Sequence, residues 1–264
     1  METFNERLKS LINKKKSCLC IGLDMDPKIL NSTKLEDLKY HTSLVIDATI
    51  DLATAFKPNF AFFERWGSAG FKWLEETVEY IGKDALTIAD AKRGDIGNTA
   101  CQYADSIFSH FCFDSVTLNP YMGTDSIKPF LGDPKKGVFI LCKTSNPSSV
   151  EFQDLNLNNK TLYERVAEVS LKLNKNKNVG LVVGATAQKE LEKIRSLTPD
   201  MPLLIPGIGA QGGDLHQSVK IGNKNGTALI NVSRGISFAG DMSKNRIRME
   251  AKKYIEKMSD ILGG

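Results

Sequence analysis

Short apolar runs recur along the chain and alternate with longer amphipathic stretches. Eight of these runs have the length and composition of buried strands, and they cover residues 18–23, 53–57, 86–90, 116–118, 138–142, 179–183, 203–206 and 228–232. Between them, apolar residues recur at helical spacing, as Phe71, Leu74, Val78 and Ile81 do. Eight strands that alternate with helices predict an α/β fold, a single (β/α)8 TIM barrel.

The length of the chain agrees with this architecture. A TIM barrel typically needs about 250 residues, and the chain has 264. We therefore expect residues 1–264 to form one domain. A doubly wound sheet with fewer strands is the alternative fold.

The N-terminal segment and the cysteines indicate a cytoplasmic protein. Phe4, Leu8 and Ile12 have helical spacing, and acidic residues stand where a signal peptide would be apolar. No apolar run approaches the roughly 20 residues of a membrane span. Five cysteines without a Cys-x-x-Cys pair suit a reducing compartment, and we expect Cys18 and Cys20 in the core.

Charge and histidine content give little support to nucleic-acid or metal binding. The net charge of +4 is spread along the chain, and its densest run, residues 14–16, is interpreted as a solvated helix end. His41, His110 and His216 lack the spacing of metal ligands, so we expect neither a zinc site nor a histidine-based triad.

The longest stretch without periodicity, residues 145–159, follows the fifth predicted strand. In a barrel this stretch would be a loop on the active-site face, and long loops there often act as lids. A disordered surface insertion is the alternative.

Polar residues follow most of the predicted strands. In TIM-barrel enzymes the catalytic groups lie at the carboxyl ends of the strands. The candidates at these ends are Asp24, Lys57, Asp90 with Lys92, Asn119, Thr144 with Ser145, and Arg234. We expect their side chains to converge on one mouth of the barrel.

Asp90 and Lys92 form the most informative pair. Strand alternation should point residues i and i+2 to the same face, and Lys57 ends the neighbouring strand. Such an array would keep a lysine protonated and a carboxylate ionised, ready to donate a proton or to stabilise developing charge. An ordinary surface ion pair is the alternative, but Ile88 before the pair and Gly94 after it put the charges at a strand end.

Two loops predict a phosphate site. Residues 206–214 are rich in glycine and follow the seventh predicted strand, and residues 233–235 follow the eighth. In barrel enzymes these two loops form a phosphate cradle, where glycines let backbone N–H groups approach the oxygens. Arg234 can grip a phosphate with two hydrogen bonds. A tight connection without a ligand is the alternative; we expect a small phosphorylated substrate.

Two motifs carry a family resemblance. Residues 89–99 contain Asp90, Lys92 and Asp95 in an Asp-x-Lys-x-x-Asp pattern, and residues 206–213 read Pro-Gly-Ile-Gly-Ala-Gln-Gly-Gly. Together with residues 56–59, they resemble the orotidine 5′-monophosphate decarboxylase family. Residues 143–147, Lys-Thr-Ser-Asn-Pro, resemble its longer-loop branch. The resemblance runs from Asp24 to Arg234, almost the whole chain.

The resemblance implies a set of site residues. The catalytic charge network would comprise Lys57, Asp90, Lys92 and Asp95. The substrate-binding residues would be Asp24, Asn59, Ile96, Thr99, Thr144, Ser145, Pro206, Gln211, Gly212, Ser233 and Arg234.

The resemblance also divides these residues by role. Asp24 and Lys57 would hold the ribose hydroxyls, and Gln211 and Arg234 would bind the phosphate. Thr144, Ser145 and Pro206 would surround the pyrimidine. Asp95, Ile96 and Thr99 would come from the other subunit of a homodimer. Ser233 stands where some members have glycine, so its backbone contact is expected to differ.

The implied reaction is the decarboxylation of orotidine 5′-monophosphate to uridine 5′-monophosphate and CO2 in de novo pyrimidine biosynthesis. Similar enzymes use no metal and no organic cofactor. Asp90 would disfavour the substrate carboxylate, while Lys92 would stabilise the developing charge and protonate C6. We weight the role of Lys92 more heavily, because a preorganised cation acts where the charge appears.

Two other functions share parts of this pattern. Phosphosugar decarboxylases and aldolases with the Asp-x-Lys-x-x-Asp motif use magnesium and an enediolate, and they commonly need a glutamate at the end of the second strand. Here Lys57 stands at that end and Glu64 lies well beyond it. A catalytically silent nucleotide-binding or scaffold protein would keep the phosphate cradle alone, but every charged residue of the motif is present.

Overall fold

The computed structural model describes residues 2–209 and 212–263. Within them, eight parallel strands close into a barrel in the order β1-β10-β9-β8-β5-β4-β3-β2. Their bounds are β1 (Leu19–Leu23), β2 (Ala55–Pro58), β3 (Leu86–Arg93), β4 (Ser115–Leu118), β5 (Gly137–Lys143), β8 (Val179–Val183), β9 (Leu203–Ile205) and β10 (Ala228–Val232). Because β1 pairs with both β2 and β10, the sheet has no edge, which excludes the doubly wound alternative. The predicted TIM barrel is confirmed.

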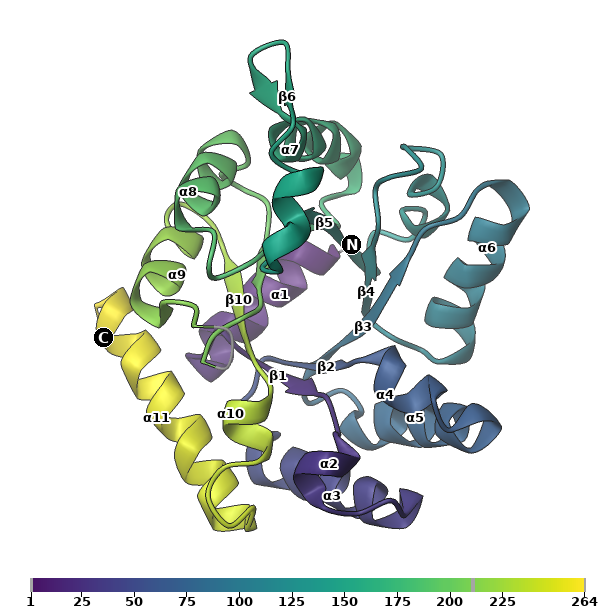
Figure 1. Cartoon of the computed structure of the whole chain (residues 1–264), viewed down its shortest axis with the longest axis vertical. Coiled ribbons are helices and arrows are strands. Elements are labelled where there is room, and N and C mark those ends of the chain that lie inside the picture. The colour runs from purple at the N-terminus through teal and green to yellow at the C-terminus, as the bar shows by residue number, and fades with distance from the viewer. Residues whose placement is uncertain (1, 210–211, 264) are drawn as a thin grey trace.

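Helices surround the barrel, as Figure 1 shows. The longer ones are α1 (Phe4–Lys15), α3 (Leu35–Thr49), α5 (Gly67–Ile81), α6 (Gly97–Asp105), α7 (Leu162–Leu173), α8 (Gln188–Leu197), α9 (Leu215–Gly222) and α11 (Lys244–Leu262). The short ones are α2 (Pro27–Leu30), α4 (Phe60–Glu64), α10 (Arg234–Ser237), the π-helix η1 (Ser106–His110) and the 3₁₀ helices η2 (Lys128–Phe130) and η4 (Asn174–Asn176). Most of the barrel strands are thus followed by a helix that packs outside them.

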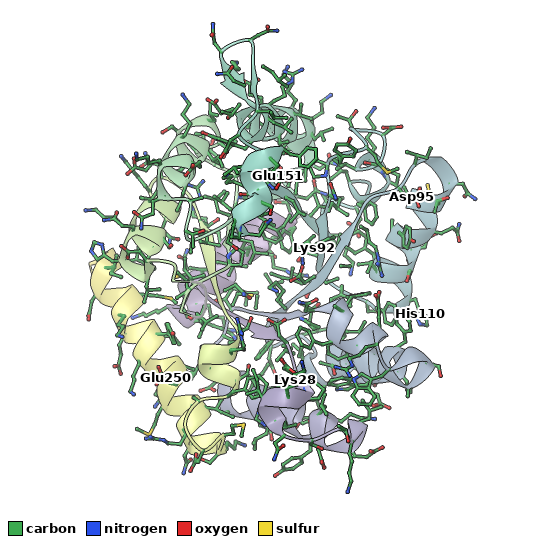
Figure 2. All side chains as sticks on the ribbon, viewed as in Figure 1. Lys28, Lys92, Asp95, His110, Glu151 and Glu250 are labelled. Atoms are coloured by element: carbon green, nitrogen blue, oxygen red, sulfur yellow. The ribbon has the colours of Figure 1, made fainter. Side chains whose placement is uncertain are left out.

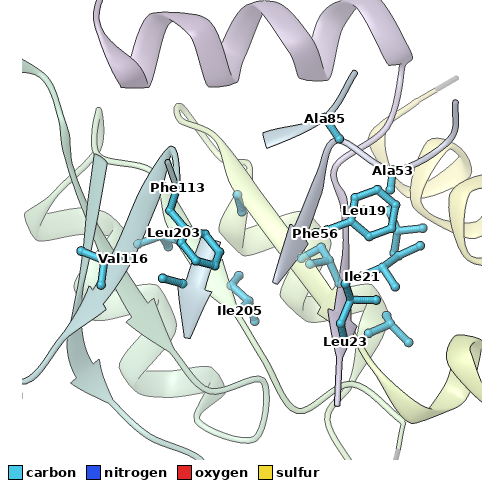
Figure 3. Close-up of a cluster of buried hydrophobic side chains, with 14 of the residues drawn as sticks. Leu19, Ile21, Leu23, Ala53, Phe56, Ala85, Phe113, Val116, Leu203 and Ile205 are labelled. Carbon is cyan, nitrogen blue, oxygen red and sulfur yellow. The ribbon is translucent and has the colours of Figure 1, made fainter. Parts of the chain in front are cut away.

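Alternate residues of each strand belong to two separate parts of the core. Leu19, Ile21 and Leu23 of β1 point outward and pack under the helices, in the cluster that Figure 3 shows. Cys20, between them, belongs to a smaller cluster inside the barrel with residues such as Leu204. Burial raises the pKa of the Cys20 thiol to about 12, so this cysteine is an inert core residue, as predicted.

Helix α1 closes the amino-terminal end of the barrel and lies behind the strands in Figure 1. Thr3 and Glu6 form a capping box that starts this helix. Phe4 and Leu8 are fully buried in the inner cluster, and the ring of Phe4 meets Phe139 edge-on at a centroid distance of 6.0 Å. The interior is therefore sealed at this end, and the carboxyl end is left as the mouth.

The lysine run at residues 14–16 does mark a helix end, since α1 ends at Lys15. Lys15 is not fully solvated, however. Its ammonium donates to the carbonyl oxygens of Ile50 and Ala53 at 2.7 and 2.6 Å, and burial lowers its pKa. The lysine run correctly predicted the end of the helix. The expectation that its side chains are solvated is wrong for Lys15.

Residues 145–159 contain local structure that the hydrophobic pattern did not predict. They include the 3₁₀ helix η3 (Pro147–Glu151) and the first strand of a hairpin, β6 (Asn156–Leu157) with β7 (Lys160–Thr161). Asn158 and Asn159 form the hairpin turn with positive φ angles of 54° and 64°. The disordered alternative is therefore wrong, and motion of this segment as a lid stays a prediction.

In the part of the chain that the structure describes, no helix has both the length and the apolar character needed to cross a bilayer. All five cysteines are free thiols.

One buried arginine links several segments of the carboxyl-terminal third of the barrel by hydrogen bonds. Arg195 on α8 is 3% exposed. Its two terminal nitrogens lie within hydrogen-bond distance of five carbonyl oxygens, those of Thr198, Pro199, Met201, Gly222 and Thr227, so one of their four N–H groups is shared between two acceptors. Burial lowers the pKa of this guanidinium to about 10, and its five acceptors stabilise the charge.

We predict that Arg195→Met lowers the free energy of unfolding by about 3 kcal/mol or more, because three buried and two partly buried carbonyl groups lose a charged donor. Urea unfolding followed by circular dichroism measures this change. Arg165→Met is the matched control, since Arg165 is exposed and pairs within its own helix with Glu168 at 3.5 Å. The control should change stability by less than about 0.5 kcal/mol. Equal losses in the two variants would contradict a structural role for Arg195.

Candidate active site

A cavity of about 470 Å³ opens at the carboxyl end of the barrel. Its floor is the uppermost layer of inward-facing strand residues, namely Lys57, Asp90, Thr117, Leu141, Val182, Leu204 and Asn231. Below this layer the interior is mostly apolar, with residues such as Ala55, Ile88 and Leu229. The polar groups therefore lie where the barrel interior meets solvent, at the end where barrel enzymes carry their active sites.

Asp90 lies between two ammonium groups at the centre of this floor. Its Oδ2 accepts from Lys57 Nζ at 2.5 Å, and its Oδ1 accepts from Lys92 Nζ at 2.5 Å. The side chains of Lys57 and Asp90 are 5% and 10% exposed, whereas that of Lys92 is 51% exposed. One cation is thus buried beneath the carboxylate, and the other faces the cavity.

The pKa values of the buried pair follow from burial and mutual attraction. Burial alone would raise the pKa of Asp90, but the attraction of Lys57 and Lys92 outweighs it and holds this pKa well below the ordinary aspartate range. Burial alone would lower the pKa of Lys57, but the negative charges of Asp90 and Asp24 outweigh it and raise this pKa. Both groups are therefore ionised at neutral pH, as the sequence predicted.

Regular strand alternation does not explain how the Lys92 side chain meets Asp90. Along β3 and β4 the register passes from Ala89 opposite Val116 to Arg93 opposite Leu118, so four steps on β3 match two on β4. Lys92 lies in this irregular segment with a φ of 47°, in the left-handed region. The predicted meeting of the two side chains is correct, but its structural basis is a bulge in β3.

The ribose-side candidates also line the cavity. Asp24 follows β1, and its Oδ1 is buried with no hydrogen-bond partner among the described residues. Asn59 follows β2, pairs with Asp90 through a backbone bridge, and caps α4 by accepting from Ala61 N at 3.3 Å. A buried carboxylate oxygen without a donor is costly, so Asp24 is prepared to accept a hydrogen bond from a bound hydroxyl.

Thr144 and Ser145 line the cavity from the loop after β5. The side-chain amide of Gln153 holds Thr144 twice, since its Oε1 accepts from Thr144 N at 2.9 Å and its Nε2 donates to Thr144 Oγ1 at 2.8 Å. Beneath them the buried Lys143 donates to Asp154 Oδ1 at 2.6 Å. The segment after β5 is thus fastened to the barrel end by groups at residues 143 and 153–154.

The structure places some of the residues predicted around the phosphate at the cavity. Pro206, Ser233 and Arg234 line the cavity, together with Gly207 and Ile208. Gly212 does not line it; its φ of 76° places it in the left-handed region that glycine adopts readily. Gln211 lies outside the described residues.

Four other candidates do not line the cavity. Asp95, Ile96 and Thr99 lie at or just before the start of α6, and Figure 2 shows Asp95 beside that helix, whereas Lys92 lies toward the middle of the ring of strands. Asn119 was expected at the mouth but faces a neighbouring cavity, where its Oδ1 accepts from Tyr121 N at 3.0 Å. The strand-end rule failed for Asn119 because, although β4 ends at Leu118 as predicted, the Asn119 side chain accepts from the backbone of its own turn at Tyr121.

Sequence reasoning missed two polar residues of the floor, Thr117 and Asn231. Both are nearly fully buried and lie on the inward-facing side of β4 and β10. They precede the strand ends, where polar residues were sought. Strand parity could have found them, because a polar residue with inward parity in a buried strand has no apolar environment to explain it.

The features of a magnesium-dependent relative are not assembled here. Among residues 2–209 and 212–263, no three histidine, cysteine, aspartate or glutamate side chains gather where they could hold a metal ion. Glu64 pairs with Arg93 at 2.8 Å and does not line the cavity.

Comparison with known proteins gives consistent matches. Residues 17–246 match the model of the orotidine 5′-phosphate decarboxylase / HUMPS family. The chain is 45% identical over 265 residues to the orotidine 5′-phosphate decarboxylase of Dehalococcoides mccartyi strain BAV1, covering 98% of this chain and 97% of that protein. It is 48% identical over 244 residues to the enzyme of the same name from Natronomonas pharaonis, covering 90% of each.

The structure is also similar to that of the orotidine 5′-monophosphate decarboxylase of Leishmania donovani. The TM-score is 0.87 at 39% identity, over 96% of this chain and 98% of that one. The similarity to the longer-loop branch that residues 143–147 indicated is confirmed.

The ionised state of Asp90 predicts how stability depends on pH. A carboxylate whose pKa is lower in the folded than in the unfolded state adds stability above the unfolded pKa of about 3.9, and this stability is lost as the pH falls. Between pH 5 and pH 3 the wild type should therefore lose about 1 kcal/mol more unfolding free energy than Asp90→Asn. Urea unfolding at both pH values measures the difference.

Glu151→Gln is the charge-matched control, because it removes one exposed carboxylate from η3, at the same end of the barrel. Its loss of stability between pH 5 and pH 3 should stay close to that of the wild type. If Asp90→Asn lost as much stability as the wild type over this range, the low pKa of Asp90 would be wrong.

Proposed function

The chain belongs to the orotidine 5′-phosphate decarboxylase family, and we propose that Lys57, Asp90 and Lys92 carry out its reaction. The protein decarboxylates orotidine 5′-monophosphate to uridine 5′-monophosphate in pyrimidine biosynthesis. The observation that carries the assignment of residues is the carboxylate of Asp90 between two ammonium groups on the cavity floor.

In the proposed mechanism the bond between C6 and the carboxylate carbon breaks, CO2 leaves, and the electron pair remains on C6. The Lys92 ammonium donates a proton to C6 and is later reprotonated from solvent. Lys92 suits this step because its charged end faces the cavity while its partner Asp90 is nearly buried. A cation already in place where negative charge appears needs no reorganisation during the reaction.

Charge balance supports transition-state stabilisation as the larger effect. The two oxygens of Asp90 accept from two ammonium groups. Two cations and one anion leave Lys57, Asp90 and Lys92 together with one net positive charge. A net positive charge attracts a developing carbanion, and it also attracts the substrate carboxylate, so it offsets the repulsion that Asp90 alone would exert. Repulsion of the substrate carboxylate by Asp90 is therefore the smaller contribution in this proposal.

The remaining cavity residues would position the substrate. Asp24, with its unpartnered Oδ1, would accept from a ribose hydroxyl, with Lys57 and Asn59 beside it. Thr144, Ser145 and Pro206 would surround the pyrimidine. Arg234, with Ser233 and the glycine-rich loop that includes Gln211 and Gly212, would bind the phosphate. Binding energy from the phosphate would be used to enclose the ring and exclude water.

We also propose a homodimer in which Asp95, Ile96 and Thr99 complete the site of the partner subunit. Ile96 is 54% exposed and Tyr121 is 83% exposed, and the two follow neighbouring strands. Their segments are in contact, because Asn119 N donates to Arg93 O at 2.8 Å. Exposed apolar side chains on adjoining segments are typical of an interface with another chain.

The proposal further includes a cytoplasmic location and a single domain over residues 1–264, with no cofactor. Free thiols at all five cysteines suit a reducing compartment. The inclusion of every long strand in one barrel and the packing of α1 inside its end support one domain.

Lys92→Ala should abolish decarboxylation, because it removes the half-exposed ammonium group that donates the proton to C6 in the proposed mechanism. The measurement is the loss of orotidine 5′-monophosphate absorbance with and without EDTA. The wild type should turn over equally in both conditions, and the variant should retain its circular dichroism spectrum and its binding of uridine 5′-monophosphate. A folded variant that keeps more than a small fraction of activity would refute the role of Lys92, and wild-type turnover abolished by EDTA would favour a metal enzyme.

The shared site predicts complementation between two inactive variants. An equal mixture of Asp95→Ala and Lys92→Ala chains, dissociated and reassembled, should regain about one quarter of wild-type activity, because half of the randomly assorted dimers would contain one intact site of two. Differently tagged chains allow the mixed dimers to be isolated and assayed. Mixed dimers that form and remain inactive would contradict the shared site.

A further inference from the structure

A hydroxyl group on β4 lies beside the charged residues of the cavity floor. Thr117 is 2% exposed, and its side chain lines the cavity beside Asp90 and Lys92. Its Oγ1 lies 2.9 Å from Lys92 N, 3.3 Å from Asp90 Oδ1 and 3.4 Å from Ala89 O. A single side chain from the neighbouring strand thus contacts both the backbone that carries the cavity-facing lysine and the carboxylate that the lysine pairs with.

The chemistry of a hydroxyl fixes the direction of the shortest of these contacts. A threonine hydroxyl has one proton and two lone pairs. The backbone N–H of Lys92 can only donate, so Thr117 Oγ1 accepts from it. The hydroxyl proton is then given to Asp90 or to the carbonyl of Ala89, and either choice leaves the bond from Lys92 in place.

The backbone of Lys92 needs such a partner. Its φ of 47° lies in the left-handed region, which costs a residue with a side chain about 1–2 kcal/mol. In addition, Lys92 lies in the bulge of β3, between the residues that pair with Val116 and Leu118, and has no partner of its own on β4. The side chain of Thr117 supplies the acceptor that the strand ladder does not.

We propose that Thr117 is a positioning residue that holds Lys92 in this left-handed conformation and so aims its ammonium group at the cavity and at Asp90. The inference rests on the proposed function of Lys92. Without the hydroxyl, the strained residue would keep an unpaired N–H in a partly buried position. Relaxation of the bulge would then withdraw the ammonium group from its place, while the groups proposed to bind phosphate and ribose would stay where they are.

The chain offers a matched control for this role. Thr87, on β3, is 1% exposed. Its Oγ1 accepts from Asp114 N at 3.0 Å and donates to Asp114 Oδ2 at 3.1 Å. It therefore makes the same two kinds of bond as Thr117, to a backbone N–H and to a carboxylate, but at the opposite end of the barrel.

The experiment compares Thr117→Val, Thr117→Ala and Thr117→Ser with Thr87→Val by steady-state kinetics, binding of uridine 5′-monophosphate and thermal unfolding. Thr117→Val and Thr117→Ala should each lower kcat by about tenfold or more, whereas KM and product affinity change by less than about threefold. Thr117→Ser keeps the hydroxyl and should restore kcat to within about threefold of the wild type. Thr87→Val should leave kcat within the same range, whatever it does to the melting temperature.

Each outcome bears on one claim. The positioning role is overturned if Thr117→Val and Thr117→Ala, once folded, keep kcat within about threefold of the wild type, or if Thr87→Val lowers kcat equally. If Thr117→Val does not fold because valine does not fit beneath the bulge, Thr117→Ala still tests the positioning role. Lys92→Ala is assayed alongside, to distinguish failure of the proposed function from failure of the positioning role. An active Lys92→Ala variant overturns the proposed function. An inactive Lys92→Ala variant together with fully active Thr117 variants overturns the positioning role alone.

Discussion

The carboxylate of Asp90, held between the ammonium groups of Lys57 and Lys92, is the interaction on which the account of this molecule depends. Burying one charge alone is costly, and burying a pair is favourable only where the geometry and further hydrogen bonds are good. Here the geometry comes from two adjacent strands, β2 and β3, whose inward-facing residues place Lys57 beside Asp90. The third charge, on Lys92, is half exposed and is left to act on whatever enters the cavity.

The barrel makes this arrangement stable by separating its apolar and polar layers. Phe4 and Leu8 of α1 seal the amino-terminal end, and an apolar cluster fills the interior above them. The charged groups Lys57 and Asp90 lie in the last inward-facing layer, at the cavity that solvent and ligand can enter. A barrel interior is a packed core rather than a pore, and this separation lets the cavity floor be rigid, because each polar group rests on tightly packed side chains.

The sequence predicted the barrel well because its strands are buried on both faces and therefore read as short apolar runs. It also predicted the convergence of Asp24, Lys57, Asp90 and Arg234, since strand ends in a parallel barrel share one rim. It could not predict the bulge in β3, because a left-handed lysine carries no local signal comparable to glycine. The same limit hid Thr117, whose importance depends on the backbone of the neighbouring strand. It also misplaced Asn119: β4 ends where it was predicted to end, but the Asn119 side chain bonds to the backbone of its own turn.

The geometry also distinguishes the two parts of the Asp-x-Lys-x-x-Asp motif. Asp90 and Lys92 face the cavity of their own barrel, whereas Asp95 lies beyond the strand, just before α6, and does not line that cavity. A motif of six residues thus spans a strand end, a bulge and the approach to a helix. The proposed dimer would give the outer residues of the motif a site to complete, and it would make assembly a condition for activity.

A crystal structure of the protein with uridine 5′-monophosphate bound would test the central claim most directly, because it fixes the position of C6 relative to the three charges. We expect the Lys92 Nζ within about 3.5 Å of C6, a distance suited to proton transfer, with Asp90 still between Lys57 and Lys92. A complex in which C6 faces another side of the cavity, with Lys92 directed away from the pyrimidine ring, would contradict it.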